Sequence, residues 1–121
     1  MNRKGMPTYN HHFDTYGAEH SYDDFIPELT GNRFDPRSWV ELILASKARY
    51  FVLDSKHHDG FALFATATTG RNSRSMGPKR DIVREVFDAA RMYAPELKRG
   101  IYYSLYEWFH PAYAGRLPSN P

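Results

Sequence analysis

The stretch SKHHDGFALF (residues 55–64) places two adjacent histidines ahead of an acid, a glycine and several aromatic residues. A neutral imidazole donates a hydrogen bond from one ring nitrogen and accepts one on the other, so two imidazoles can grip several hydroxyl groups of a sugar. On an extended strand, however, adjacent side chains point to opposite faces. His57 and His58 can reach one ligand only if the chain turns beside them, and Asp59-Gly60 is a turn signal directly after them.

Two other interpretations of these histidines stay open. One histidine can be buried and satisfied by the backbone while the other is exposed, which is an ordinary structural outcome. A zinc site is also conceivable, because suitable donor atoms are present in His57, His58, Asp59, Glu107 and His110. Adjacent histidines are poor zinc ligands, since zinc sites usually space their ligands by several residues. The metal site is therefore less favoured, and no metal or cofactor is expected.

Two segments predict the helices that must position these residues. In FDPRSWVELILASKA, Asp35 can cap the first turn, Pro36 suits the first helical position, and apolar residues follow at one-face spacing. In DIVREVFDAARMYAP, Asp81 supplies the start signal and Pro95 the stop signal. The faces expected to be buried are Trp39, Val40, Ile43 and Leu44 in the first helix and Ile82, Val83, Val86, Phe87, Ala90 and Tyr93 in the second.

Each helix is followed by a predicted strand. RYFVLDS (residues 49–55) is a short apolar run typical of a strand buried on both faces, and residues 100–104 form the second strand. The order helix, strand, long loop, helix, strand predicts an α/β fold with a parallel sheet. Polar and aromatic residues follow both strands, and ligands bind at the carboxyl edge of such sheets. Glu107, in the second of these segments, is the carboxylate best placed for acid or base chemistry.

Composition limits the classes of protein. The 121 residues are 41% hydrophobic and 25% charged, which is typical of a soluble globular domain. The net charge is only +2 and the basic residues are dispersed, so no nucleic-acid partner is expected. No apolar run approaches the roughly 18 residues that span a bilayer, and the first residues lack the apolar core of a signal peptide. The absence of cysteine excludes disulfides.

The chain is expected to form one incomplete domain. Residues 1–34 read as an irregular lead-in, 35–113 as the helix–strand–loop–helix–strand segment, and 114–121 as a tail. Two parallel strands leave sheet faces and edges uncovered, so another part of a longer protein must complete the core. Turnover by this chain alone is not expected.

Three stretches, YFVLDSKHHDGFALF, NSRSMGPKRDIV and GIYYSLYEWFHPAY, closely resemble the N-terminal half of the α-L-fucosidase catalytic domain, glycoside hydrolase family 29. They occur in the same order and at similar spacing. The preceding stretches DTYG, YDDFIPELTG and FDPRSWVEL are also similar to that family. The resemblance covers roughly residues 8–113. One departure is Gly70-Arg71, where the family often has an aromatic residue before NS.

The resemblance implies a partial (β/α)₈ barrel of the TIM type, with about two βα units and a leading helix. It implies cofactor-free, retaining hydrolysis of terminal α-L-fucose from glycans or glycoconjugates, with His57, His58 and Tyr102 contacting the sugar. The nucleophile and the acid/base carboxylate are expected outside this chain, in the missing remainder of the barrel. Members of the family are commonly extracellular or lysosomal. The alternatives are a non-catalytic fucose-binding module and, less favoured, a metal-dependent hydrolase.

Overall fold

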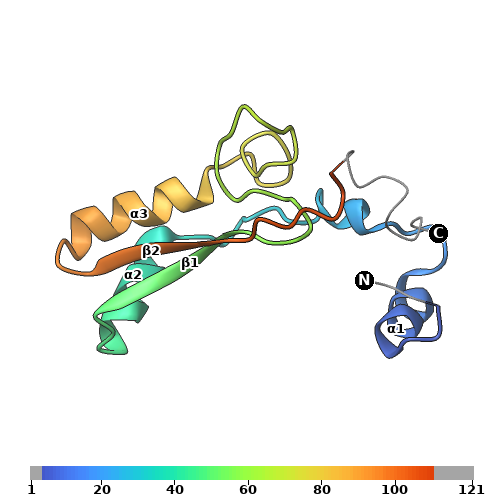
Figure 1. Ribbon diagram of the computed structural model, residues 1–121. Coiled ribbons are helices and arrows are strands. Elements are labelled where there is room, and N and C mark those ends of the chain that lie inside the picture. The colour runs from blue at the N-terminus through green and yellow to red at the C-terminus, as the bar shows by residue number, and fades with distance from the viewer. Residues whose placement is uncertain (1–3, 111–121) are drawn as a thin grey trace.

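The computed structural model describes residues 4–110. Its elements are α1 (Pro7–Tyr16), the short 3₁₀ helix η1 (Tyr22–Phe25), α2 (Pro36–Ala45), β1 (Tyr50–Lys56), α3 (Ile82–Tyr93) and β2 (Lys98–Tyr103). From α2 onward the order is the predicted one, and Figure 1 shows α2 and α3 running alongside the two strands. The expected tail, residues 114–121, lies outside the described residues.

Both long helices begin where their capping residues predict. The side chain of Asp35 accepts a hydrogen bond from the Arg37 amide at 3.0 Å, and that of Asp81 accepts one from the Arg84 amide at 2.9 Å. These bonds satisfy amides that the first turn of a helix leaves without partners. Pro36 occupies the first turn of α2, as predicted. The starts of α2 and α3 are therefore confirmed.

The core between α2 and α3 is narrow. It is built from Val40, Ala89, Ala90, Ala94 and Leu97, with Ile43 and Phe51 packed against it. Three of these five buried residues are alanine, and Val40 is the one residue that α2 buries. The predicted burial of Val40, Ile82, Val86 and Ala90 is confirmed. The prediction is wrong for Trp39, Leu44 and Tyr93, each more than 40% exposed at 44%, 44% and 43%.

Strands β1 and β2 pair in parallel, as predicted, from Tyr50 opposite Lys98 to Asp54 opposite Tyr102. The second strand begins earlier than residue 100, because the pairing already starts at Lys98. On one face Phe51 meets the ring of Phe87 on α3. The other face was expected to be buried as well, but Tyr50 and Val52 are 67% and 57% exposed. Helices cover only one side of the sheet within the described residues.

The sequence predicted an irregular lead-in, but this prediction is wrong in part, because the lead-in contains α1 and η1. Pro7 occupies the first turn of α1, and Gly17 ends the helix with φ 87°, its amide bonded to the Phe13 carbonyl at 2.9 Å. The helix buries none of its residues and lies apart from α2 and α3 in Figure 1. Its lack of a buried apolar stripe explains why periodicity missed it. Within residues 4–110, no helix has both the length and the apolar character to cross a bilayer.

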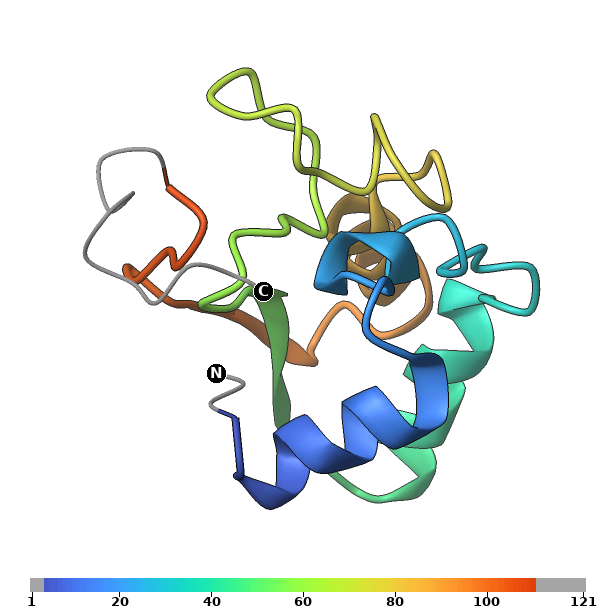
Figure 2. The same ribbon diagram turned by 90° about the vertical axis from the view of Figure 1, so that its right-hand side faces the viewer.

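The long segment between β1 and α3 has no regular secondary structure, as predicted, but backbone hydrogen bonds order it. Ala62 is the centre of this network: its amide donates to the Arg71 carbonyl at 3.0 Å, and its carbonyl accepts from the Ser73 amide at 2.8 Å. The Ser73 carbonyl in turn accepts a hydrogen bond from the Arg80 amide at 2.8 Å. Figure 2 shows this segment, yellow-green to yellow, on the side of the molecule away from α1. These hydrogen bonds hold the segment in one defined conformation beside the carboxyl ends of the strands.

Candidate functional site

The two adjacent histidines lie in a tight turn directly after β1. The Gly60 amide donates to the His57 carbonyl at 3.1 Å, and Gly60 adopts φ +75°. Just before the turn, the register of β1 against β2 shifts between Asp54 and Lys56. As a result the rings of His57 and His58 lie beside each other, with centroids 4.1 Å apart. The predicted convergence of the two imidazoles is confirmed, although His57 is exposed and His58 only half-buried.

Tyr102 joins the histidines from the neighbouring strand. Its ring stacks on that of His57 with centroids 5.8 Å apart and planes 18° apart. The next residue, Tyr103, instead contacts Phe64, at a centroid distance of 6.5 Å. The two tyrosines have different neighbours because successive side chains of a strand point to opposite faces. All three residues proposed for sugar contact therefore lie together at one edge of the sheet.

The loop after β2 wraps around His58. The Ser104 hydroxyl is hydrogen-bonded to His58 Nδ1, and the Trp108 amide donates to the His58 carbonyl at 2.7 Å. The rings of Tyr106 and Trp108 meet the His58 ring at an angle, at 5.6 and 5.1 Å. Aromatic faces with a few directed polar groups are the usual lining of a site for an amphipathic ligand such as a sugar.

A second set of contacts fastens the lead-in to the histidine turn. The Tyr22 hydroxyl donates to Asp59 Oδ2 at 3.3 Å, and Arg71 donates to Asp23 at 2.6 Å and to the Asp59 carbonyl at 3.2 Å. The Arg71 guanidinium lies over the Phe109 ring, 4.9 Å from its centroid. Arg71 thus links the lead-in, the histidine turn and the segment after β2. Nothing in the sequence indicated these contacts, because they join residues far apart in the chain.

Tyr22 gives the first testable prediction. Burial, and then the charge and hydrogen bond of Asp59, raise the pKa of Tyr22 above its usual value. A raised pKa in the folded state adds stability that is complete below the unfolded-state pKa of about 10 and is lost as the pH rises through the folded-state pKa. We expect Tyr22→Phe to lower the free energy of unfolding by about 0.5 kcal/mol at pH 7, because this bond is half-exposed.

Urea unfolding of the full-length wild-type protein and of its Tyr22→Phe variant at several pH values checks this prediction. The difference between the two proteins should shrink as the pH rises above 10. A difference that stays constant across this range contradicts the assigned role of the Tyr22 hydroxyl.

The carboxylate singled out for acid or base chemistry is engaged elsewhere. Glu107 Oε2 lies 3.6 Å from Lys56 Nζ, and the side chains are 24% and 4% exposed. The zinc interpretation finds no support in the geometry: among residues 4–110, no three His, Cys, Asp or Glu side chains are grouped so that they could hold a metal ion. Glu107 therefore has a structural partner, and the histidines face aromatic rings and a hydroxyl instead of further metal ligands.

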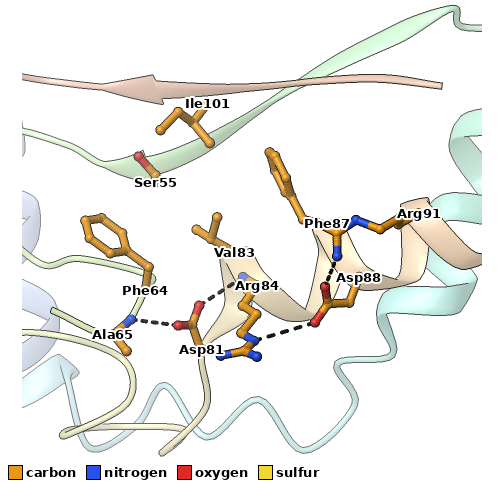
Figure 3. Close-up of a pocket in the computed structure, with 10 residues that line it drawn as sticks. All are labelled: Ser55, Phe64, Ala65, Asp81, Val83, Arg84, Phe87, Asp88, Arg91 and Ile101. Atoms are coloured by element: carbon orange, nitrogen blue, oxygen red, sulfur yellow. Dashed lines mark hydrogen bonds and ion pairs between the residues drawn. The ribbon is translucent and has the colours of Figure 1, made fainter. Parts of the chain in front are cut away.

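A groove of about 500 Å³ lies between α3 and the sheet, on the opposite side from Tyr102. Figure 3 shows Val83 and Phe87 pointing from α3 toward Ser55 and Ile101. Its outer rim is polar, with Asp88 paired to Arg91 at 2.6 Å and to Arg84 at 3.6 Å. The histidines do not line this groove. The groove lies on the face of the sheet that the helices cover, at a place that α3 leaves open. It is separate from the histidine site.

The fold and the site together define an α/β protein that presents histidines and aromatic residues at the carboxyl edge of parallel strands, where ligands bind in such folds. The family model described as Alpha-L-fucosidase matches residues 1–121. The chain belongs to the α-L-fucosidase family, as its resemblance predicted.

Individual relatives agree with this assignment. Human plasma alpha-L-fucosidase is 44% identical over 101 residues, which are 83% of this chain and 21% of the relative. Human tissue alpha-L-fucosidase is 40% identical over 112 residues, 91% of this chain and 24% of the relative. The structure of Thermotoga maritima alpha-fucosidase with a mechanism-based inhibitor superposes with a TM-score of 0.83 at 38% identity, covering 88% of this chain and 25% of that one. The chain thus spans between a fifth and a quarter of the length of these relatives.

Proposed function

We propose that this chain is the sugar-binding part of a longer retaining α-L-fucosidase, which hydrolyses terminal α-L-fucose from glycans or glycoconjugates. His57, His58 and Tyr102 bind the fucose. The nucleophile and the acid/base carboxylate are supplied by the remainder of the protein, and neither a metal nor a cofactor takes part. Retaining hydrolysis needs two carboxyl groups about 5 Å apart, one on each side of the anomeric carbon.

The observation that carries the proposal is the convergence of the two imidazoles with Tyr102. Their centroids lie 4.1 Å apart within the histidine pair and 5.8 Å apart between His57 and Tyr102. Imidazole nitrogens and a phenol present donors and acceptors for hydroxyl groups, while the neighbouring rings offer apolar surface for the other side of a pyranose. This arrangement occurs in a chain of the α-L-fucosidase family.

The related structures support fucose as the sugar. The Thermotoga maritima alpha-fucosidase has been solved in complex with fucose, and a fucosynthase from the same organism with alpha-L-Fuc-(1-2)-beta-L-Fuc-N3. Both superpose on this chain with TM-scores of 0.80 or more, at 39% and 38% identity. A fucosylated oligosaccharide or glycoconjugate is therefore the proposed substrate class.

The proposed architecture is a (β/α)₈ barrel, of which α2, β1, α3 and β2 supply about two βα units. In such a barrel the face that carries Tyr50 and Val52 turns inward and the helices form the outer layer. Tyr50 and Val52 are 67% and 57% exposed because the strands that would cover them in the barrel are not part of this chain. The groove beside Phe87 and Ile101 is the proposed seat of the next helix of the outer layer.

The test is hydrolysis of 4-nitrophenyl α-L-fucoside by the full-length protein that contains this chain, followed by proton NMR to identify the first anomer of fucose released. The α-anomer is expected. Release of the β-anomer would contradict the retaining mechanism. Binding of fucose without any hydrolysis would favour the fucose-binding module, and loss of activity on removal of stoichiometric zinc would favour the metal-dependent hydrolase.

A further inference from the structure

Lys56, at the end of β1, is a buried lysine that the proposed chemistry does not use. Its side chain is 4% exposed. The ammonium donates to the backbone carbonyls of Ser104 and Tyr106, each at 3.0 Å, and lies 3.6 Å from Glu107 Oε2. It also lies over the ring of Tyr103, 5.0 Å from its centroid. Lysine is almost never buried without partners, and here its hydrogen-bond and ion-pair partners all come from residues 104–107, directly after β2.

The segment that Lys56 holds is the one that contacts His58. The Ser104 amide donates to the Lys56 carbonyl at 3.0 Å, so Ser104 is held through both its amide and its carbonyl by the same lysine. Its hydroxyl is then hydrogen-bonded to His58 Nδ1. Tyr106, whose carbonyl accepts from the ammonium, places its ring 5.6 Å from that of His58. The position of His58 is therefore coupled to the ammonium through two neighbouring residues.

Glu107 braces the histidine turn from the same segment. A Cβ atom added at Gly60 would lie 2.7 Å from Glu107 Cγ and 2.9 Å from its Oε1, so the carboxylate side chain packs directly on the turn. The Glu107 side chain is in turn held by Lys56. Glu107 thus connects Lys56 to the histidine turn.

We infer that Lys56 is a positioning residue for the fucose site, which acts by holding residues 104–107 so that Ser104 and Tyr106 fix the orientation of the His58 ring. This inference rests on the proposed function of that site. A serine hydroxyl both donates and accepts, so the hydrogen bond at Nδ1 anchors the ring whichever nitrogen carries the proton. A sugar hydroxyl then meets a ring that is already held in one position and need not be ordered when the sugar binds.

The experiment uses the full-length protein and two variants, Lys56→Met and Ser104→Ala, with Lys98→Met as the matched control. Lys98 is an exposed lysine at the opposite end of β2. Calorimetry with fucose gives the dissociation constant, and the ring ¹⁵N spectrum of His58, assigned with His58→Gln, reports the hydrogen bonding of Nδ1. We expect Lys56→Met and Ser104→Ala to weaken fucose binding about tenfold and to shift the Nδ1 resonance of His58. Lys98→Met should change neither.

Two results would overturn the inference. The first is a Lys56→Met protein with wild-type circular dichroism, fucose affinity and His58 spectrum. The second applies if Lys56→Met does not fold: a Ser104→Ala protein that binds fucose as tightly as the wild type removes the proposed role of the 104–107 segment. A wild-type protein that binds fucose while both variants behave normally rejects only this inference, whereas a wild-type protein that neither binds nor hydrolyses fucosides rejects the proposed function itself.

Discussion

Replacing His58 with alanine is expected to weaken fucose binding by the full-length protein by about 1–3 kcal/mol, which is roughly 5- to 150-fold in the dissociation constant. The change removes the ring nitrogen that is proposed to meet a sugar hydroxyl, and it also leaves the Ser104 hydroxyl without its hydrogen bond to Nδ1. His57→Ala should cost a similar amount, with added loss of the stacked surface on Tyr102. Calorimetry with fucose and kcat/KM on a fucoside measure both effects.

His11→Ala is the control for this pair. His11 is an exposed histidine on α1, outside the histidine turn and the segment that wraps it. It should leave fucose affinity unchanged, because α1 lies apart from the strands (Figure 1). If His57→Ala and His58→Ala bind fucose as well as His11→Ala does, the two imidazoles are structural and the proposed sugar site is wrong.

The elements that carry the site could be predicted because their signals are local. Asp35 and Asp81 cap their helices through amides two and three residues away, a relation that is visible in the sequence itself. The convergence of the histidines was equally local, since it depends on a four-residue turn that ends at Gly60. By contrast, α1 was missed because it buries no residue and so has no apolar stripe to detect.

The contacts that hold the site in place could not be predicted in the same way. Lys56 and Ser104 are 48 residues apart, and they meet only because the two strands pair in one particular register. Arg71 and Asp23 are also 48 positions apart, and they meet because the long loop passes beside η1. A single sequence shows which residues can form charged or polar pairs, but the pairing itself follows from the register of the sheet and the path of the long loop.

Gly77→Ala is expected to lower the free energy of unfolding of the full-length protein by about 2–4 kcal/mol. Gly77 has φ +58°, and a Cβ atom there would lie 2.9 Å from the Ile26 carbonyl oxygen and 3.0 Å from that of Leu29. Both obstacles are backbone atoms, so no side-chain rotation relieves the clash. Lys79, with φ 58° in the same loop, carries a full side chain, so φ alone does not require glycine here. Glycine is required at position 77 because the backbone of the lead-in approaches it closely.

Urea unfolding with Gly70→Ala as the control measures this effect. Gly70 lies in the same long loop, has no atom within 4 Å of the added Cβ, and is not in the left-handed region. It should unfold close to the wild type. Because the lead-in also carries Tyr22, whose hydroxyl holds Asp59 in the histidine turn, Gly77→Ala should in addition weaken fucose binding a few-fold. Equal stability of the two alanine variants would mean that the lead-in is not seated on Gly77, and an unaltered fucose affinity would mean that its seating does not reach the histidines.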